Sequence, residues 1–495
     1  MTSRRALLRL VAGASLGHPL ARGSLAWAGA ATTRETPASG DIRPQHLRIE
    51  WRRAPLGIDA SRPRFTWTLA ARSPQMRSLE QRACRIIVAS SPAAARSGRG
   101  DIWDSGRLAT AEPRTAPAHD LPLASQTPYW WAVRVWDGRG GASAFSEPVS
   151  FTTGLMSAAD WRARWIAAGP DWVGSPEPPP AINRSPPVQP RPLPLLRHEF
   201  RLDKPLRYAV LSLCGLGQHE LRINGRRAGT SVLDPGWTDY RKTVLYDTFE
   251  VSHLLRTGTN ALAVLLGNGF FNVEKYPGRY TKLVGSFGRP RLILQLRLAF
   301  ADGTEELVVS DGQWRAHSGP IVLSSVYGGE DFDARLEPAG WDHANFAPDG
   351  RWAPATEVRG PGGALRSQAM PPITVARTLA PVAVTIPRSG VLVYDLGENF
   401  SGWPAIAVRG PAGRRVKLLP GELLDAQGLV TQRSANAGPG DEVSFSYTLA
   451  GTGVEQWRPR FSYYGFRYLQ VEGALPPGLA AVGEPELLEI HGEFL

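Results

Sequence analysis

The segment from Pro235 to Phe271 constrains the fold more than any other part of the chain. It contains a turn, two stretches in which apolar and polar residues alternate, and an apolar stretch punctuated by glycine. Alternation with a period of two places every second side chain on one face, which is typical of a half-buried β-strand. Comparable short stretches, bounded by turn residues, recur from Leu47 onward. The pattern therefore predicts an all-β protein.

Composition and length support this prediction and suggest several domains. The 495 residues include 52 Gly and 43 Pro, and long runs with a helical period are missing. Such a composition suits short strands joined by tight turns, and the length allows two to four domains with cores of their own. We expect three consecutive β-sandwich domains.

The first sandwich is expected over residues 46–155, with a fibronectin type III-like arrangement. Its clearest strand is YWWAVRVWD, in which Trp131, Val133 and Val135 share one face and the residues between them share the other. We expect the face with Trp131 to lie in the core. Turns that carry Gly, Pro, Asp and Ser follow at intervals typical of a sandwich.

Two further sandwiches are expected beyond a proline-rich connector at 156–194. Residues 195–375 show many antiparallel strand patterns, including a hairpin at Asn224-Gly225, and predict a jelly-roll of the kind found in carbohydrate-binding modules. Residues 376–490 predict another β-sandwich.

The N-terminus has the features of an export signal. Residues 1–31 combine the pair Arg4 and Arg5 with a short apolar stretch and an alanine-rich cleavage region, followed by a polar linker at 32–45. This predicts twin-arginine export to the periplasm or the extracellular space. The apolar stretch is too short to span a membrane, so no membrane span is expected.

Other functional classes find little support in the residues. Cys84 and Cys214 lie in separate apolar stretches, which predicts two buried thiols rather than a disulfide or a metal site. The nine His residues show no metal-ligand spacing, and no phosphate loop or nucleophile motif is present, so neither a metal nor a cofactor is expected. The net charge of +11 comes from scattered Arg, with five Lys among 56 basic residues, so nucleic acid is not expected as a partner.

A candidate sugar-binding site lies in the segment from Pro235 to Phe271. Trp237, Asp239, Tyr240 and Asn268, with Asn272 nearby, combine aromatic rings and short polar side chains at turns. A sugar needs a ring to stack on and groups that bond its hydroxyls. The alternative is that the aromatic residues only fill the rim of a sandwich.

Several motifs give the chain a resemblance to a known family. PLGIDASRPRFTW (55–67), GDIWDSGR (100–107), DWRARWI (160–166) and YGGEDFDAR (327–335) resemble segments of bacterial α-L-rhamnosidases. The resemblance extends from about Leu47 to the last residue and implies hydrolysis of terminal α-L-rhamnosyl residues from rhamnose-containing glycosides or polysaccharides. It also implies that the acid and base lie in an (α/α)6 barrel, which would begin where this chain stops. We therefore expect no catalytic residue here and no activity from the chain alone.

The resemblance bears on three segments that could bind or dock. Asn268-Gly269-Phe270-Phe271 stands where the family often has an Asp-Gly-Trp-Tyr-like sequence, which puts a calcium or sugar site there in doubt. The segment 327–335 is expected to dock neighbouring domains. The segments 394–403 and 461–468 are expected to form an exposed, partly apolar interdomain surface.

Three origins and two other functional classes stay open at this point. The chain could come from a truncated gene, form half of a split enzyme with a separate barrel chain, or be a free-standing module. A carbohydrate-binding or surface-adhesion protein is the alternative from another class. A basic nucleic-acid binder is a distant third, and steep salt dependence would mark it.

Overall fold

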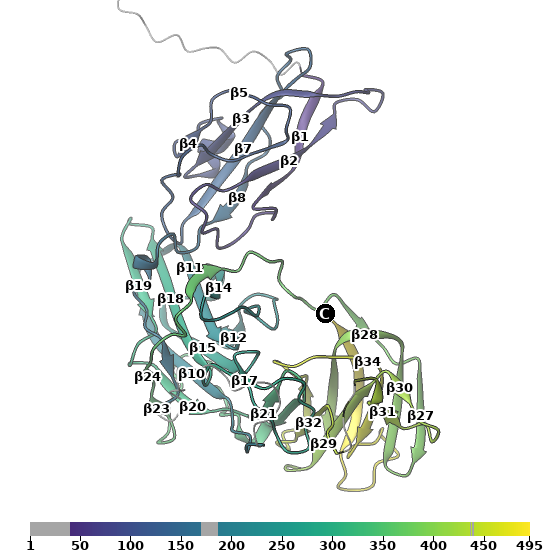
Figure 1. Cartoon of the computed structure of the whole chain (residues 1–495). Helices are drawn as coiled ribbons and strands as arrows, with labels where there is room; N and C mark the ends of the chain where they lie inside the picture. Colours follow the sequence, from purple (N-terminus) through teal and green to yellow (C-terminus); the bar gives the residue numbers. More distant parts are fainter. Residues whose placement is uncertain (1–39, 170–186, 436, 438–439) are drawn as a thin grey trace, which may run out of the picture. The chain divides into compact units, whose positions relative to one another are not determined.

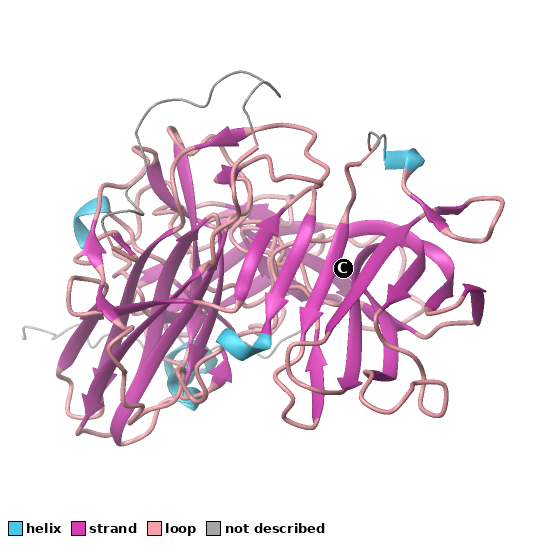
Figure 2. Cartoon of the chain, turned by 90° about the horizontal axis from the view of Figure 1, so that it is seen from below, coloured by secondary structure: helices cyan, strands magenta, loops and turns pink. Residues whose placement is uncertain are grey.

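Strands make up nearly all of the regular structure in this computed structural model, which describes residues 40–169, 187–435, 437 and 440–495 (Figure 1). Figure 2 shows that the helical segments are short turns between strands. Among the described residues the α-helical part is α1 (Pro92–Arg96), capped by the Ser91 hydroxyl, which accepts from the Ala94 N–H. The all-β prediction is confirmed. The predicted signal peptide, most of the linker and the middle of the connector lie outside the described residues.

The first sandwich has two antiparallel sheets. One contains β1 (Ile42–Ile49), β2 (Phe65–Ala71) and β6 (Arg114–Thr115); the other contains β4 (Trp103–Asp104), β3 (Gln81–Ala89), β7 (Pro128–Asp137) and β8 (Val149–Thr152), with β5 (Leu108–Ala109) paired to β3. Trp131, Val133 and Val135 of β7 are fully buried between the sheets, which confirms the predicted core face.

The second sandwich encloses a leucine-rich core between two larger sheets. One sheet has the order β13 (Arg226–Arg227), β12 (Gln218–Ile223), β15 (Gly258–Gly267), β10 (Pro194–Leu202), β20 (Arg315–Ser318) and β23 (Ala353–Pro354). The other has the order β24 (Thr356–Glu357), β9 (Ile166–Ala167), β18 (Arg291–Phe300), β11 (Leu206–Leu216), β14 (Thr243–Glu250) and β25 (Ala364–Ser367), with β19 (Glu305–Val309) paired to β18. A small antiparallel pair, β16 (Asn272–Val273) and β17 (Gly285–Ser286), lies in the sequence between β15 and β18.

The predicted hairpin at Asn224-Gly225 joins β12 to β13. Both turn residues have positive φ, 52° for Asn224 and 81° for Gly225, as the tight hairpin turn requires. The turn fixes the register in which Leu221 and Ile223 point into the core. The hairpin prediction is confirmed.

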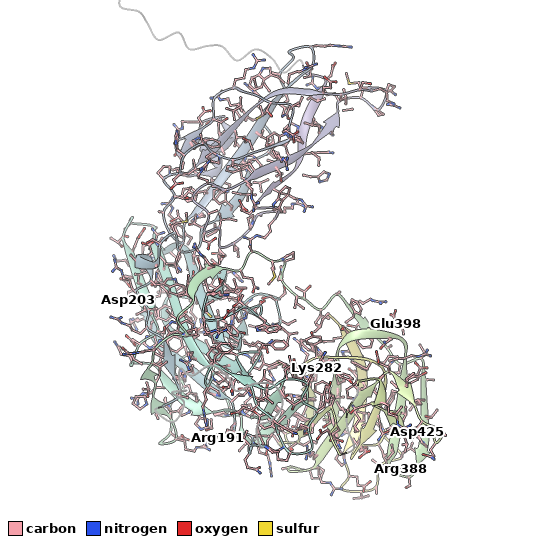
Figure 3. The ribbon with its side chains drawn as sticks, in the orientation of Figure 1. Arg191, Asp203, Lys282, Arg388, Glu398 and Asp425 are labelled. Atoms are coloured by element: carbon pink, nitrogen blue, oxygen red, sulfur yellow. The ribbon has the colours of Figure 1, made fainter. Side chains whose placement is uncertain are left out.

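The third sandwich is built on one extensive sheet. Its order is β21 (Ile321–Ser325), β22 (Gly329–Asp333), β32 (Ser444–Thr448), β29 (Arg415–Gly421), β34 (Tyr464–Glu472), β28 (Val391–Arg409), β35 (Glu486–Phe494) and β26 (Arg377–Leu379). Strands β27 (Ala383–Arg388) and β33 (Val454–Trp457) also pair with β28, and β30 (Leu423–Leu424) forms a hairpin with β31 (Val430–Thr431). Figure 3 labels Glu398, Arg388 and Asp425 among its surface side chains.

One hairpin from the range predicted for the second sandwich belongs to the third. Strands β21 and β22 come from the range 195–375, yet β22 runs parallel to β32 and extends the third sheet. A continuous apolar cluster joins Leu195 and Leu265 of the second sandwich to Phe332, Phe445 and other residues of the third. The domain ranges predicted from the sequence did not assign this hairpin to the third sandwich, because strand patterns do not reveal which sheet a hairpin joins.

Candidate functional site

The loop between β13 and β14 carries three of the four predicted site residues and is tied down by hydrogen bonds. The Gly236 N–H donates to the Gln368 side chain at 2.7 Å, and the Thr238 hydroxyl donates to the Thr243 carbonyl at 2.6 Å. The Thr243 N–H donates to the Asp239 carbonyl at 2.9 Å. Because the backbone is fixed at several points, the loop presents its side chains in defined directions.

An aromatic pocket of about 410 Å³ opens beside this loop. The Trp237 and Phe270 rings stack with centroids 4.5 Å apart and planes 15° apart, and the Tyr327 ring meets Phe270 edge-on at 5.9 Å. The remaining lining residues are Thr238, Asp239, Arg241, Val273, Leu283, Val284, Gly285 and Phe287. Lys282, which precedes Leu283, is labelled in Figure 3.

Trp237 supplies the exposed ring of the aromatic pocket. Its side chain is 61% exposed, although large aromatic side chains are usually buried. Phe270 supports one face of the indole, so the ring is held in place while much of its surface contacts solvent. A supported, exposed indole is suited to stacking on the apolar face of a sugar ring.

Asp239 supplies an ionised carboxylate at the edge of the same pocket. Its Oδ1 accepts from the Arg241 Nε at 3.1 Å, and the Lys242 ammonium lies 3.4 Å from Oδ2. The hydrogen bond from Arg241 is the main cause that lowers the pKa of Asp239. The group is therefore a hydrogen-bond acceptor at neutral pH and not a proton donor.

The structure does not place Tyr240 and Asn268 on the pocket surface. Tyr240 is 1% exposed and meets Phe271 and Phe287 edge-on at 5.2 and 5.3 Å, and burial raises its pKa. Asn268 is 4% exposed, and its amide donates to the Ser324 carbonyl at 2.9 Å and accepts from Asn272. Both residues shape the core beneath the pocket, so we restrict the candidate contacts to Trp237 and Asp239 among the predicted residues.

The sequence pattern does not place Phe270 and Tyr327 beside Trp237. Phe270 stands out in the sequence only as a departure from a family pattern, and Tyr327 lies 90 positions after Trp237. An alternating pattern shows which residues share a strand face, but not which turns meet in space. The signal that could have found the pocket is that Trp237, Phe270 and Tyr327 are aromatic residues beside turn residues in the same predicted domain, 195–375.

The segment 327–335 links the second and third sandwiches. Glu330 is fully buried and accepts from the backbone N–H groups of Arg460 and Phe461, at 3.1 and 3.0 Å. Asp331 accepts two hydrogen bonds from the Arg279 guanidinium, at 2.8 and 2.7 Å. These contacts agree with the expected docking role.

The segments 394–403 and 461–468 require a correction. Their apolar residues were expected to be exposed, but Phe400, Trp403, Phe461 and Phe466 are at most 4% exposed. The Phe400 and Phe466 rings lie 4.5 Å apart inside the third sandwich, on strands β28 and β34. The expectation was wrong for these residues because Phe400 and Phe466 face the core of the third sandwich and Trp403 packs on Val232 and Leu233; Tyr463, by contrast, is 44% exposed.

Other predicted features can be compared directly with the described residues. Cys84 and Cys214 are both free and buried, which confirms two buried thiols. Within residues 40–169, 187–435, 437 and 440–495, no three His, Cys, Asp or Glu side chains are grouped to hold a metal ion. No helix in that part of the chain is both long and apolar enough to cross a membrane.

Three protein families match consecutive parts of the chain. Residues 44–157 match the Rha78A-like N-terminal immunoglobulin domain, and residues 204–377 match the α-L-rhamnosidase N-terminal domain. Residues 386–491 match the bacterial α-L-rhamnosidase concanavalin-like domain. The first sandwich thus matches an immunoglobulin domain, whereas a fibronectin type III-like arrangement was predicted.

Individual relatives agree with the family matches. An α-L-rhamnosidase of Streptomyces avermitilis is 31% identical over an alignment that covers 86% of this chain and 55% of the relative. One from Formosa agariphila is 30% identical, covering 85% of this chain and 45% of the relative. The chain therefore spans about half the length of the curated relatives it matches.

Solved structures show the same similarity. The α-L-rhamnosidase from Dictyoglumus thermophilum superimposes with a TM-score of 0.78 at 33% identity, over 92% of this chain and 49% of that one. The Streptomyces avermitilis enzyme, solved in complex with L-rhamnose, gives 0.78 at 28% identity, over 92% and 57%. The order of the matched domains, the sequence identity and the fold agree, and the chain carries the N-terminal β-domains found in bacterial α-L-rhamnosidases.

Proposed function

We propose that the chain is the non-catalytic β-domain region of an α-L-rhamnosidase, which removes terminal α-L-rhamnosyl residues from glycosides. In this role the aromatic pocket binds the rhamnose-containing glycan. The main observation behind the proposal is that the exposed Trp237 ring stacks on Phe270 beside the ionised carboxylate of Asp239. The complex of the Streptomyces avermitilis relative with L-rhamnose supports the choice of sugar.

The pocket is suited to binding rather than to hydrolysis. Glycosidases of this general kind use two carboxyl groups, one of which must be protonated to donate to the leaving oxygen. Asp239 is the single carboxylate among the described residues that line the pocket, and its cationic neighbours favour the ionised form. We therefore assign the chemical step to a part of the enzyme outside these sandwiches.

A calorimetric titration with methyl α-L-rhamnopyranoside tests the proposed binding. Loss of a stacking aromatic removes about 1–3 kcal/mol in comparable contacts, so Trp237→Ala should weaken binding about tenfold or more. The melting temperature should change little, because the indole is mostly exposed. Trp51→Ala is the matched control, since Trp51 is 51% exposed but lies on the first sandwich.

Two results would contradict the proposal. Parent protein that binds no rhamnoside would make the aromatic pocket a structural feature only. Equal weakening by Trp51→Ala and Trp237→Ala would show that the loss is not specific to the pocket. Binding in the parent without any barrel partner encoded nearby would instead favour the adhesion alternative.

The proposal includes export of the protein to the periplasm or beyond. Its support is the pair Arg4 and Arg5 ahead of a short apolar stretch in the sequence. Replacement of both by Lys should retain the protein in the cytoplasm, as measured by cell fractionation.

A further inference from the structure

A second pocket, of about 340 Å³, lies between the second and third sandwiches, and we call it the arginine pocket. It differs from the aromatic pocket in being lined largely by charged side chains. The charged lining residues are Arg222, Arg227, Arg458, Arg460, Glu220, Glu489 and Glu493, with His491 beside them.

Strand alternation and one short loop bring these side chains together. Leu221 and Ile223 of β12 point into the second sandwich, so Glu220 and Arg222 project from its outer face. Arg458 and Arg460 come from the loop that follows β33 of the third sandwich. The Arg460 Nε lies 3.6 Å from the Glu220 Oε1, which joins the two sandwiches across the pocket.

Not every arginine in the pocket has its hydrogen-bonding capacity filled. Arg222 is well satisfied, since it donates to Glu220 at 2.9 Å and to Asp342 at 3.1 Å. The Arg458 guanidinium makes one hydrogen bond, to Glu493 at 2.9 Å, and that of Arg460 makes none with the described residues. A guanidinium has five N–H donors, so several donors of these two residues are available to a ligand.

The arginines of the pocket crowd around one carboxylate. Glu220 lies within 3.6 Å of Arg222, Arg227 and Arg460, and Arg222 also pairs with Asp342. Burial opposes ionisation of Glu220, yet Arg460, Arg222 and Arg227 together lower its pKa to about 2. The pKa of Arg227 is lowered by burial and by its three arginine neighbours, although Glu220 acts in the opposite direction.

One wall of the pocket is apolar. Ala405, Ile406 and Ala407 of β28 line it together with Trp457. A bare inorganic ion would gain nothing from such a wall, whereas an organic anion can place its carbon skeleton there. The volume lies at the small end of the usual range for ligand pockets, which runs from roughly 300 to 1,000 Å³, and suits a single sugar unit.

We propose that the arginine pocket binds the carboxylate of an acidic saccharide, with a uronate unit as the recognised group. The planar guanidinium matches a carboxylate through paired hydrogen bonds, and Arg458 and Arg460 have the donors to form them. The site is separate from the aromatic pocket, and its ligand does not have to contain rhamnose. It would let the β-domains distinguish acidic from neutral glycans.

The test titrates the chain with sodium D-glucuronate and, in parallel, with the methyl ester of D-glucuronic acid. The ester keeps the sugar and removes the charge, so it should bind at least about tenfold more weakly. Arg458→Gln and Arg460→Gln should each weaken glucuronate binding by about the same factor. Arg409→Gln is the matched control, because Arg409 ends β28, pairs with Glu486 and does not line the pocket.

Several outcomes would overturn the proposal. Failure of the parent to bind glucuronate, or equal binding of the ester, would leave the cluster as an ion-pair link between sandwiches. Displacement of glucuronate by inorganic sulfate of equal affinity would show that the pocket recognises any oxyanion and no saccharide. If Arg460→Gln unfolds because Glu220 loses a partner, Arg458→Gln and the ester still decide the result.

Discussion

The two pockets of this chain differ in where their residues come from and in what they can hold. The aromatic pocket is formed by turns of the second sandwich and by Tyr327 of the β21–β22 hairpin, and an exposed indole dominates it. The arginine pocket exists only where two sandwiches meet, and its residues come from four separate stretches of sequence. A supported, exposed indole and a cluster of arginines thus form in one chain, the first mainly from turns and the second where two sandwiches meet.

The largest expected effect concerns the core beneath the aromatic pocket. Tyr240→Ala should lower the free energy of unfolding by roughly 3–5 kcal/mol, because it removes a buried ring packed on Phe271 and Phe287. Chemical denaturation followed by tryptophan fluorescence measures this. Trp237→Ala, three positions earlier, should cost far less stability.

Tyr240→Phe is the control for that comparison. It keeps the ring, and the Tyr240 hydroxyl makes no hydrogen bond with the described residues, so stability should fall only slightly. If Tyr240→Ala and Trp237→Ala destabilise equally, the division of the loop into a buried and an exposed half is incorrect.

The next effect concerns Glu330, whose buried carboxylate accepts a hydrogen bond from the backbone of Arg460, a residue that lines the arginine pocket. No such buried carboxylate is found among the described residues that line the aromatic pocket. Burial raises the pKa of Glu330 from 4.5 to about 7. Between these values the unfolded chain has lost the proton that the folded chain keeps, so this group's contribution to stability falls as the pH rises to about 7. The loss is on the order of 3 kcal/mol and is complete above that pH.

Glu330→Gln isolates this contribution. The amide resembles the protonated acid, so variant and parent should be similarly stable at pH 4, and the variant should be more stable at pH 8. Thermal unfolding across the pH range measures the difference. Parallel curves for the two proteins would show that Glu330 titrates normally.

The smallest expected effect is the influence of a substitution in one pocket on binding at the other. Because they share no lining residue, Trp237→Ala should change glucuronate binding by about twofold or less, and Arg458→Gln should do the same for the rhamnoside. Calorimetry of both variants with both ligands measures this. A tenfold cross-effect would instead indicate one extended site that binds a glycan with both kinds of sugar.

Local patterns predicted much of the fold because they depend on neighbours in sequence. Trp131 and its alternating partners lie in the core, and Asn224-Gly225 forms the expected hairpin. The hairpin of β21 and β22 could not be placed in the same way. Its strands have ordinary strand patterns, and only the position of β32 beside β22 decides that they extend the third sheet.

The candidate site was predicted in part. Trp237 and Tyr240 are aromatic residues of one turn, and nothing in their spacing tells which of them faces solvent. Trp237 lies on the surface over Phe270, while Tyr240 fills a space between Phe271 and Phe287. Tyr327 joins the pocket from a distant turn.

The sequence by itself determined that this chain is all-β, that it has the domain pattern of the α-L-rhamnosidases, and that Asn224-Gly225 forms a hairpin. Strand period, turn residues and family motifs are local properties, and each can be read along the chain. Only the tertiary structure decided which aromatic residues are exposed and that four arginines converge between two sandwiches. Burial and charge clustering depend on contacts between segments far apart in sequence, which no local pattern specifies.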